Sequence, residues 1–199
     1  FLKKWCNPWN YKVCNKKYSG RFDTTIRICE EKVMILKYRN ATPNDIEEIY
    51  SIIRTAIDAM ERDNIFQWDD LYPTKEDFQE DVDKSQLYVG SVNGQIAVVY
   101  TLNQKCDKEY ENGKWKYKDK PFYIVHRLCV NPTFQNRGIA KSTLLYIEKQ
   151  LTEMGIHVIR LDVFSNNPFA LRLYNSLGYS EVGYADWRKG KFFLMEKCF

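Results

Sequence analysis

Apolar residues recur every three or four positions in three stretches of the chain, and this spacing predicts three amphipathic helices. The first is expected to begin after Thr42, a preferred N-cap residue that precedes a proline and an acidic first turn. The second is expected from about Gly138 to Gly155, and the third from Pro168 to Gly178. A shorter helix is predicted from Thr74 to about Lys84. The apolar stripes consist of Ile46, Ile49, Ile53, Ile57 and Met60, of Ala140, Leu144, Ile147, Leu151 and Met154, and of Ala170, Leu173 and Leu177.

Runs of alternating or continuous apolar and β-branched residues predict seven strands. Asn93-Gly94 joins two of them and is a strong signal for a tight hairpin turn. The polar stretch Asn103–Lys120, rich in Lys, Glu and Tyr, is expected to be a solvated loop. The order of helices and strands predicts a mixed α+β sheet in a single domain over residues 34–199. The predicted strands are Ile35–Arg39, Leu87–Val92, Gln95–Leu102, Phe122–Val130, Val158–Val163, about Ser180–Ala185 and Lys191–Lys197.

The composition excludes several classes of protein. Of the 199 residues, 44% are hydrophobic, which rules out general disorder and collagen-like repetition. No apolar run approaches the ~18 residues that a membrane-spanning helix needs, so no membrane association is expected. Six cysteines without a Cys-x-x-Cys pair, together with only two histidines, predict free thiols in a reducing cytoplasm and no metal site.

The net charge of +4 belongs to the first 33 residues, which hold eight basic and three acidic side chains. They show no helical or strand period, and Met34 directly precedes the first strand pattern. We interpret residues 1–33 as a basic N-terminal arm, upstream of the domain or appended to it, with Met34 as the natural start. Nucleic-acid binding through Lys and Trp of this arm is an alternative that we do not favour, because no known binding module is visible.

The turn before the helix at Gly138 has the chemistry of an anion site. The string Gln135-Asn136-Arg137-Gly138-Ile139-Ala140 connects a strand to a helix start, where free N–H groups and the helix dipole favour a pyrophosphate. Arg137 and Lys141 add positive charge. A nucleotide-binding P-loop is excluded, since its two glycines would fall on Gln135 and Ala140. Taken alone, the string also fits an ordinary strand-to-helix turn.

A second string runs from Asn167 to Tyr179 and reads N-x-x-A-x-x-L-Y-x-x-x-G-Y. Together with Leu128-x-Val130-x-Pro132 and the string at Gln135, it resembles the GNAT family of N-acetyltransferases, in the family's order of elements and over about residues 34–199. Each string alone is moderately specific, and three in the correct order and spacing are strong. The resemblance implies a central, mostly antiparallel sheet whose parallel central strands splay apart, flanked by about four helices.

The resemblance also implies acetyl-CoA as co-substrate, with its pantetheine arm in the gap between the splayed strands. Leu128 and Val130 would offer main-chain groups to that arm, and Asn167 would contact the arm or the start of the last helix. The residues implied around the pyrophosphate are Gln135, Asn136, Arg137, Gly138, Ile139, Ala140 and Lys141.

The implied reaction is direct transfer of an acetyl group to a primary amine within a ternary complex. It requires a neutral amine and protonation of the leaving thiolate. Tyr174 would stand near the CoA sulfur and donate to it, or it would pack against the core. Many family members carry a glutamate base on the strand equivalent to Phe122–Val130, whereas this strand has no acidic residue. His126 is its only group that titrates near neutrality, and we expect it either as the base or as a packed or substrate-orienting residue.

Alternation along this strand predicts His126, Leu128 and Val130 on one face, and Arg127 and Cys129 on the other. On that placement Cys129 is a core residue and a poor candidate for a nucleophile.

Trp68 and Tyr72 lie between the first helix and the hairpin, where they would form a flat wall for the acceptor or pack the short helix onto the sheet. The acceptor would be the amine of a small molecule or of a peptide. A non-catalytic acyl-CoA-binding or sensing domain is the alternative from another class, because the strand carboxylate is missing. Neither the acceptor nor the oligomeric state, monomer or homodimer, follows from the sequence.

Overall fold

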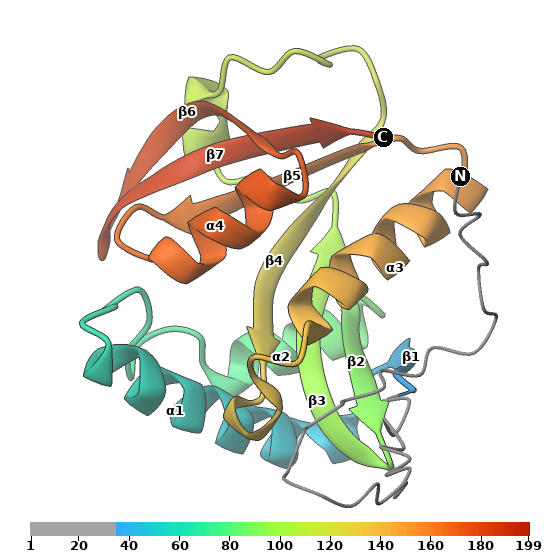
Figure 1. Cartoon of the computed structure of the whole chain (residues 1–199), viewed down its shortest axis with the longest axis vertical. Helices are drawn as coiled ribbons and strands as arrows, with labels where there is room; N and C mark the ends of the chain where they lie inside the picture. The colour runs from blue at the N-terminus through green and yellow to red at the C-terminus, as the bar shows by residue number, and fades with distance from the viewer. Residues whose placement is uncertain (1–34) are drawn as a thin grey trace, which may run out of the picture. The chain divides into compact units, whose positions relative to one another are not determined.

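The seven predicted strands all form and pair into one sheet. They are β1 (Lys37–Asn40), β2 (Leu87–Val92), β3 (Gln95–Asn103), β4 (Phe122–Val130), β5 (Val158–Phe164), β6 (Ser180–Trp187) and β7 (Gly190–Cys198). The order in the sheet is β1-β2-β3-β4-β5-β7-β6, and every neighbouring pair is antiparallel except β4 and β5, which are parallel (Figure 1). The α+β fold with a mostly antiparallel sheet is thereby confirmed. The computed structural model describes residues 35–199, so the predicted arm and the start at Met34 lie outside the described residues.

The four predicted helices are α1 (Ile46–Arg62), α2 (Lys75–Asp83), α3 (Ile139–Glu153) and α4 (Pro168–Ser176). Their starts follow the capping residues of the sequence. At α2 the Thr74 hydroxyl accepts a hydrogen bond from the N–H of Asp77, whose carboxylate accepts one from the N–H of Thr74. This reciprocal arrangement satisfies two N–H groups that a helix start otherwise leaves free. A short 3-10 turn, η1 (Pro43–Asp45), separates Thr42 from α1.

Helices cover both faces of the sheet (Figure 1). On one face α1 and α2 pack against β2 and β3 through fully buried side chains such as Ile49, Ile53 and Phe78. On the other face α3 and α4 pack against β4 and β5, with Leu144 and Leu151 at the centre. Full burial of one such side chain contributes about 1.5–3 kcal/mol, so the predicted stripes hold the two layers to the sheet. Met154 departs from its stripe, with 60% of its surface exposed, because α3 ends one residue before it.

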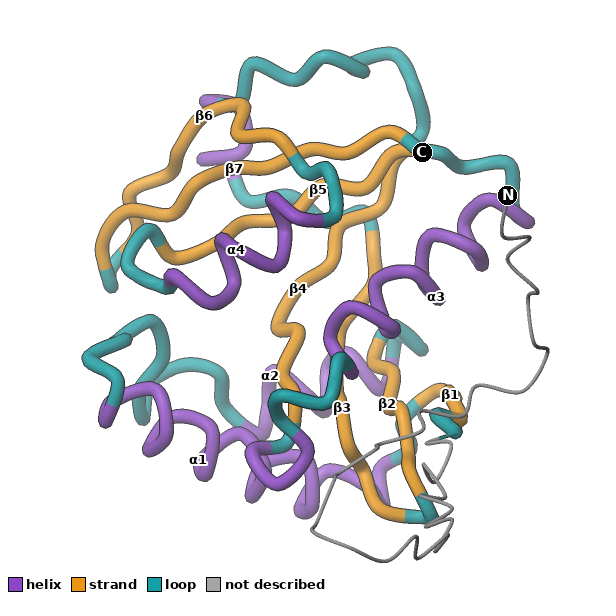
Figure 2. The backbone as a smooth tube through the Cα atoms, in the orientation of Figure 1, coloured by secondary structure: helices purple, strands orange, loops and turns teal. Residues whose placement is uncertain are grey.

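β4 and β5 separate halfway along their length, as the family resemblance implied. Their pairing runs from Phe122 opposite Val158 to Val125 opposite Leu161 and then stops. Further along, β4 remains paired with β3 and β5 with β7, and Figure 2 shows the two strands diverging. From this point onward, each strand has one edge that no other strand of residues 35–199 covers.

The alternation predicted along β4 is wrong, because the strand contains a β-bulge. Thr101 of β3 pairs with His126 and Val99 pairs with Cys129, so two residues of β4 stand opposite the single residue between Val99 and Thr101. Arg127 occupies the bulge with a φ of 51°, a left-handed value that non-glycine residues seldom adopt.

The bulge changes which side chains share a face. His126 lies on the face of its partner Thr101, whose hydroxyl donates to Asp81 of α2. Leu128 packs instead into the core under α3. His126 and Leu128 therefore lie on opposite faces, in contrast to the predicted shared face.

The stretch between β3 and β4 is not a solvated loop throughout, which corrects the expectation for Asn103–Lys120. It contains a 3-10 helix, η2 (Lys108–Asn112), and a small core in which Tyr110 and Trp115 are 4% and 9% exposed. These rings pack against Ile124 of β4 and Leu194 of β7. A run of lysines and glutamates with scattered aromatic residues has no period that would reveal this core.

Candidate active site

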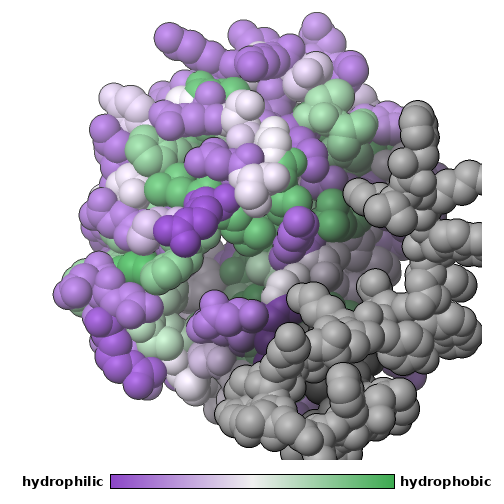
Figure 3. Space-filling model, in the orientation of Figure 1, coloured by the Kyte–Doolittle hydropathy of each residue, from purple (hydrophilic) through white to green (hydrophobic). Residues whose placement is uncertain are grey.

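A cavity of about 580 Å³ lies where β4 and β5 separate. One wall comes from α2 and the α1–α2 connection, and the other comes from α4 and the β6–β7 turn. The space-filling view shows the surface hollowed between the part that carries α4 and the part that carries α1 (Figure 3). Such a volume suits the reacting ends of two substrates. The predicted site residues that line it are Trp68, Tyr72, His126, Leu128, Asn167 and Tyr174.

His126 lies in the wall nearest α2, where its Nε2 is 3.1 Å from Oδ1 of Asn103. That oxygen also accepts a hydrogen bond from the N–H of Lys105, and the amide nitrogen of Asn103 donates to Gln86. Oδ1 is therefore an acceptor, and Nε2 of His126 carries the proton. Burial, reinforced by the charge of Arg127, lowers the pKa of His126 to about 4. The imidazole is neutral at pH 7 and a weak base.

Asp162 brings to the cavity the carboxylate that β4 lacks. It is the first residue of β5 beyond the last pair with β4. The hydroxyl of Tyr110 donates a hydrogen bond of 2.8 Å to its Oδ2. Burial raises the pKa of Asp162 to about 6, although the hydrogen bond from Tyr110 acts in the opposite direction. A carboxylate that is ionised at pH 7 and binds a proton more tightly than usual has the property required of a general base.

Tyr174 lies on α4, 8% exposed, with its side chain in the cavity lining. Burial, followed by the charge of Asp162, raises the pKa of its hydroxyl well above the usual value. Within residues 35–199 the hydroxyl makes no hydrogen bond, so its proton is available to a ligand in the cavity. Its ring also packs in the core under α3, so the packing role weighed from the sequence is present, whereas the role as a donor to the CoA sulfur stays a prediction.

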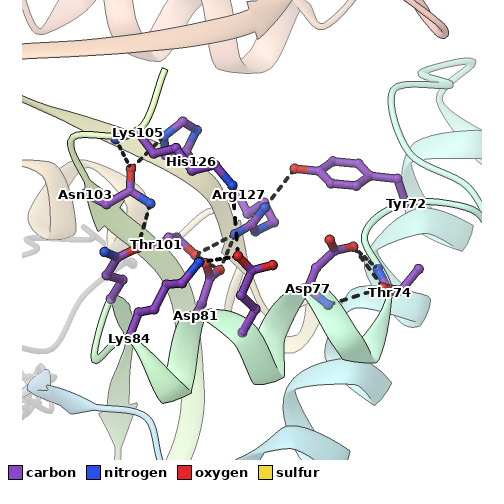
Figure 4. A network of polar contacts seen from close by, with 12 residues as sticks. Tyr72, Thr74, Asp77, Asp81, Lys84, Thr101, Asn103, Lys105, His126 and Arg127 are labelled. Atoms are coloured by element: carbon purple, nitrogen blue, oxygen red, sulfur yellow. Dashed lines mark hydrogen bonds and ion pairs between the residues drawn. The ribbon is translucent and has the colours of Figure 1, made fainter. Parts of the chain in front are cut away.

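Arg127 reaches from the bulge of β4 toward α2 and the α1–α2 connection (Figure 4). One Nη donates to the hydroxyl of Tyr72 over 2.9 Å, and the other pairs with Asp81 and lies 3.4 Å from Oγ1 of Thr101. The side chains of Arg127 and Asp81 are 13% and 9% exposed. The cluster fixes a largely buried positive charge beside the cavity, and this charge disfavours protonation of both His126 and Asp162.

Asn167 connects the two walls of the cavity. Its Oδ1 accepts a hydrogen bond from the N–H of Ala170 and caps α4, which confirms the predicted place at the helix start. Its amide nitrogen donates to Oε1 of Gln67, in the α1–α2 connection, over 2.8 Å. One side chain therefore positions both α4 and the segment that carries Trp68.

A second link joins the same connection to the β6–β7 turn. Both carboxylate oxygens of Asp69 are 2.7 Å from the guanidinium of Arg188, and Lys189 lies 3.2 Å away. Trp68, 9% exposed, packs into the core of α1 and α2, which is one of its two expected roles, and it also lines the cavity. Its contact with the acceptor stays a prediction. Tyr72 is more exposed and is held by Arg127.

The residues predicted around a pyrophosphate form the turn before α3 and its first turn. Gly138 precedes the helix with a φ of 75°, and no side chain caps the start. Within residues 35–199, no hydrogen bond engages the backbone N–H groups of residues 138–141. Free N–H groups at a helix start fit an anionic group. Val130 and residues 135–141 lie outside the lining of the cavity, which contains only Leu128 and Asn167 of the predicted cofactor contacts.

The sequence also led us to expect no cysteine nucleophile, no metal site and no membrane-spanning helix. Cys129 is buried, and burial raises the pKa of its thiol to about 12, so it is a core residue and not a nucleophile. Residues 35–199 contain no group of His, Cys, Asp and Glu side chains arranged for a metal ion. Every helix within residues 35–199 is too short or too polar to cross a membrane.

Three residues of the site were not found from the sequence. Asp162 left a signal, because it is the one acidic residue of β5 and stands between Leu161 and Val163. Arg127 and Tyr110 left none, since their places depend on a bulge and on the path of an irregular segment.

Comparisons with known proteins point to one family. A family model described as the acetyltransferase (GNAT) family matches residues 46–179. The N-alpha-acetyltransferase RimI of Mycobacterium tuberculosis is 30% identical over 121 residues, which are 60% of this chain and 68% of that protein. A ribosomal protein bS18-alanine N-acetyltransferase of Haemophilus ducreyi is 38% identical over 58 residues, or 29% of this chain, and the match spans 40% of that protein.

A solved structure shows the same fold. The GNAT-family acetyltransferase of Streptococcus agalactiae superposes with a TM-score of 0.74 at 23% sequence identity, covering 82% of this chain and 95% of that chain.

Proposed function

Because the chain belongs to the acetyltransferase (GNAT) family, we propose that it is an acetyl-CoA-dependent N-acetyltransferase whose acceptor is a primary amine. The observation that carries this proposal is the cavity at the β4–β5 gap, which Asp162 and Tyr174 both line. The free N–H groups at the start of α3, with Arg137 and Lys141 beside them, fit the pyrophosphate of acetyl-CoA. The uncovered edge of β4 fits the amides of its pantetheine arm.

Acetyl-CoA supplies the thioester that the amine attacks. Asp162 takes one proton from the ammonium form of the acceptor, which frees the nitrogen lone pair. As the C–N bond forms and the C–S bond breaks, the hydroxyl of Tyr174 donates a hydrogen bond to the leaving sulfur. The second amine proton passes to the thiolate, and Asp162 returns its own proton to water. The raised pKa of Tyr174 keeps its proton in place and suits a hydrogen-bond donor to the developing thiolate.

His126 is assigned the orienting role in this mechanism. Its lowered pKa makes it a weaker base than Asp162, while its Nε2–H is fixed by Asn103. The acceptor is proposed to lie between Trp68 and Tyr72 on one side and the β6–β7 turn on the other. The names of the relatives, an N-alpha-acetyltransferase and a ribosomal alanine N-acetyltransferase, support a peptide α-amine, and a small-molecule amine remains the other acceptor class.

A panel of amines tests the proposal. Alanine-initiated peptides, lysine peptides and small amines are incubated with acetyl-CoA, and the release of CoA is measured for the natural chain and for Tyr174→Phe. We expect release with at least one class of amine and a lower rate for the variant. Binding of acetyl-CoA without release of CoA across the whole panel would contradict the proposed activity and indicate a non-catalytic acyl-CoA-binding domain.

A further inference from the structure

Residues 104–121, here called the β3–β4 segment, bring one hydroxyl group to the carboxylate at the β4–β5 gap. Tyr110 of this segment is 4% exposed, and its hydroxyl donates to Oδ2 of Asp162 over 2.8 Å. We propose that the β3–β4 segment is part of the active site and that Tyr110 is a positioning residue, which holds the Asp162 carboxylate ready to receive the proton of the acceptor amine. The inference rests on the function proposed for Asp162.

Trp115 holds Tyr110 in place by its ring and by its indole N–H. The two rings stack with centroids 5.6 Å apart, and Nε1 of Trp115 donates to the backbone oxygen of Tyr110 over 2.8 Å. Trp115 is in turn held by Arg160, whose guanidinium lies 4.2 Å from the centroid of its ring. A phenol held in this way keeps its hydroxyl directed at one acceptor, and it loses little further freedom when it forms the hydrogen bond.

The segment is also docked on the sheet through its main chain. The N–H of Lys114 donates to the oxygen of Val182 over 2.7 Å, and the N–H of Lys116 donates to the carboxylate of Glu196 over 2.8 Å. Glu196 is buried and paired with Arg160 at 3.2 Å. A β-carbon added at Gly183 would lie 2.8 Å from the backbone oxygen of residue 112, so the close approach needs a glycine there. The position of the segment is therefore specified by the fold.

Charged and titratable groups approach Asp162 from several elements. Burial raises its pKa, the Tyr110 hydrogen bond lowers it, the charge of Asp107 raises it and that of Arg127 lowers it. Two residues of the β3–β4 segment thus act on Asp162 in opposite directions. The groups from the surrounding elements are Tyr110 and Asp107 of the segment, His126 and Arg127 of β4, Tyr174 of α4, Tyr72 of the α1–α2 connection, and Arg188 and Lys189 of the β6–β7 turn.

These opposite effects predict shifts of the Asp162 titration midpoint in opposite directions for two variants. Tyr110→Phe removes a donor that favours the ionised carboxylate, so the titration midpoint of Asp162 should rise by about one pH unit. Asp107→Asn removes a like charge, so the midpoint should fall, by less because Asp107 is exposed. Tyr117→Phe is the matched control, since it makes the same chemical change in the same segment, away from the cavity.

The midpoint is measured by carbon-13 NMR of the aspartate carboxyl groups, with the Asp162 signal identified by its loss in Asp162→Asn. The same order of midpoints is expected on the acid limb of the kcat/KM profile. Asp162 must be ionised to accept a proton, so Tyr110→Phe should lose most activity near pH 6 and far less at pH 8. Gly183→Ala, which displaces the segment and leaves the hydroxyl intact, should shift the midpoint in the same direction as Tyr110→Phe.

An unchanged midpoint in Tyr110→Phe would overturn the inference, as would an equal loss of activity at every pH, which is the mark of a structural defect alone. The NMR titration needs no turnover, so it decides the matter even for an inactive protein. Absence of CoA release from the natural chain contradicts the proposed function instead, and the two failures are thus distinguishable.

Discussion

His126 and Asp162 occupy equivalent places on neighbouring strands: each is the first residue beyond the last pair of β4 and β5, Val125 opposite Leu161. Burial acts on them in opposite senses, lowering the pKa of His126 to about 4 and raising that of Asp162 to about 6. In both cases burial disfavours the charged form. The order of base strength usual for free histidine and aspartate is therefore reversed here, and Asp162 is the better proton acceptor.

Asp162→Asn should lower kcat/KM about 10²- to 10⁴-fold, because it removes the proton acceptor and keeps the shape of the side chain. The acid limb near pH 6 should disappear with it. Steady-state rates between pH 5 and pH 9 check this. Asp186→Asn makes the same chemical change at an exposed position of β6 and should leave the profile as it is. An acid limb that survives in Asp162→Asn and vanishes in His126→Asn would assign the base to His126.

The same variant should be more stable than the natural chain at neutral pH. The pKa of Asp162 is about 6 in the folded chain, above its ordinary value of 3.8. The stability that this group contributes is therefore fully present below pH 3.8 and is lost as the pH rises through 6. At pH 7 we expect Asp162→Asn to raise the free energy of unfolding by about 2 kcal/mol, with a smaller difference at pH 4. Urea unfolding at the two pH values measures both.

Tyr174→Phe should lower kcat roughly tenfold to a hundredfold and change the KM for acetyl-CoA little, because its hydroxyl is proposed to act on the leaving sulfur. The loss should be similar at all pH values at which Asp162 is ionised. Tyr184→Phe, on the exposed face of β6, is the control. Unchanged turnover in Tyr174→Phe would leave Tyr174 with a packing role only.

Asp81→Asn should lower the free energy of unfolding by about 3 kcal/mol, because it leaves Arg127 buried without its counter-charge. Glu80→Gln on the same helix is the comparison, since its partner Lys84 is exposed and such pairs contribute little. Chemical denaturation of the two variants separates the cases. Equal losses would contradict the buried-charge explanation.

Lys141→Ala should raise the KM for acetyl-CoA several-fold at low salt and leave kcat nearly as it is, because Lys141 stands in the first turn of α3, where the pyrophosphate is proposed to bind. The effect should shrink as the salt concentration rises. Lys149→Ala, further along α3, should have no such effect. Equal KM values in the two variants would place the pyrophosphate elsewhere.

Local patterns predicted the elements of the fold closely. Capping residues such as Thr74 and the hairpin signal Asn93-Gly94 act through contacts a few residues apart, so the sequence displays them. The GNAT resemblance, now confirmed, predicted the order of the helices and strands and the gap between the two parallel strands. The site was less visible, because its chemistry depends on exceptions to regular structure. The bulge at Arg127 places His126 and Leu128 on opposite faces of the sheet. The β3–β4 segment folds back onto the sheet through contacts that no periodic pattern in the sequence predicts.

The links between the two walls of the cavity have a kinetic consequence. Asp69 and Arg188 are 25% and 50% exposed, so water and salt already weaken their attraction, and separating the α1–α2 connection from the β6–β7 turn costs little. By contrast, the side chains of Leu144 and Leu151 on α3 are fully buried against the sheet, and separating this helix from the sheet would expose a core. We therefore expect the acceptor amine and its product to exchange between the α1–α2 connection and the β6–β7 turn while acetyl-CoA or CoA stays bound. This favours an ordered kinetic sequence, in which acetyl-CoA binds first and CoA leaves last.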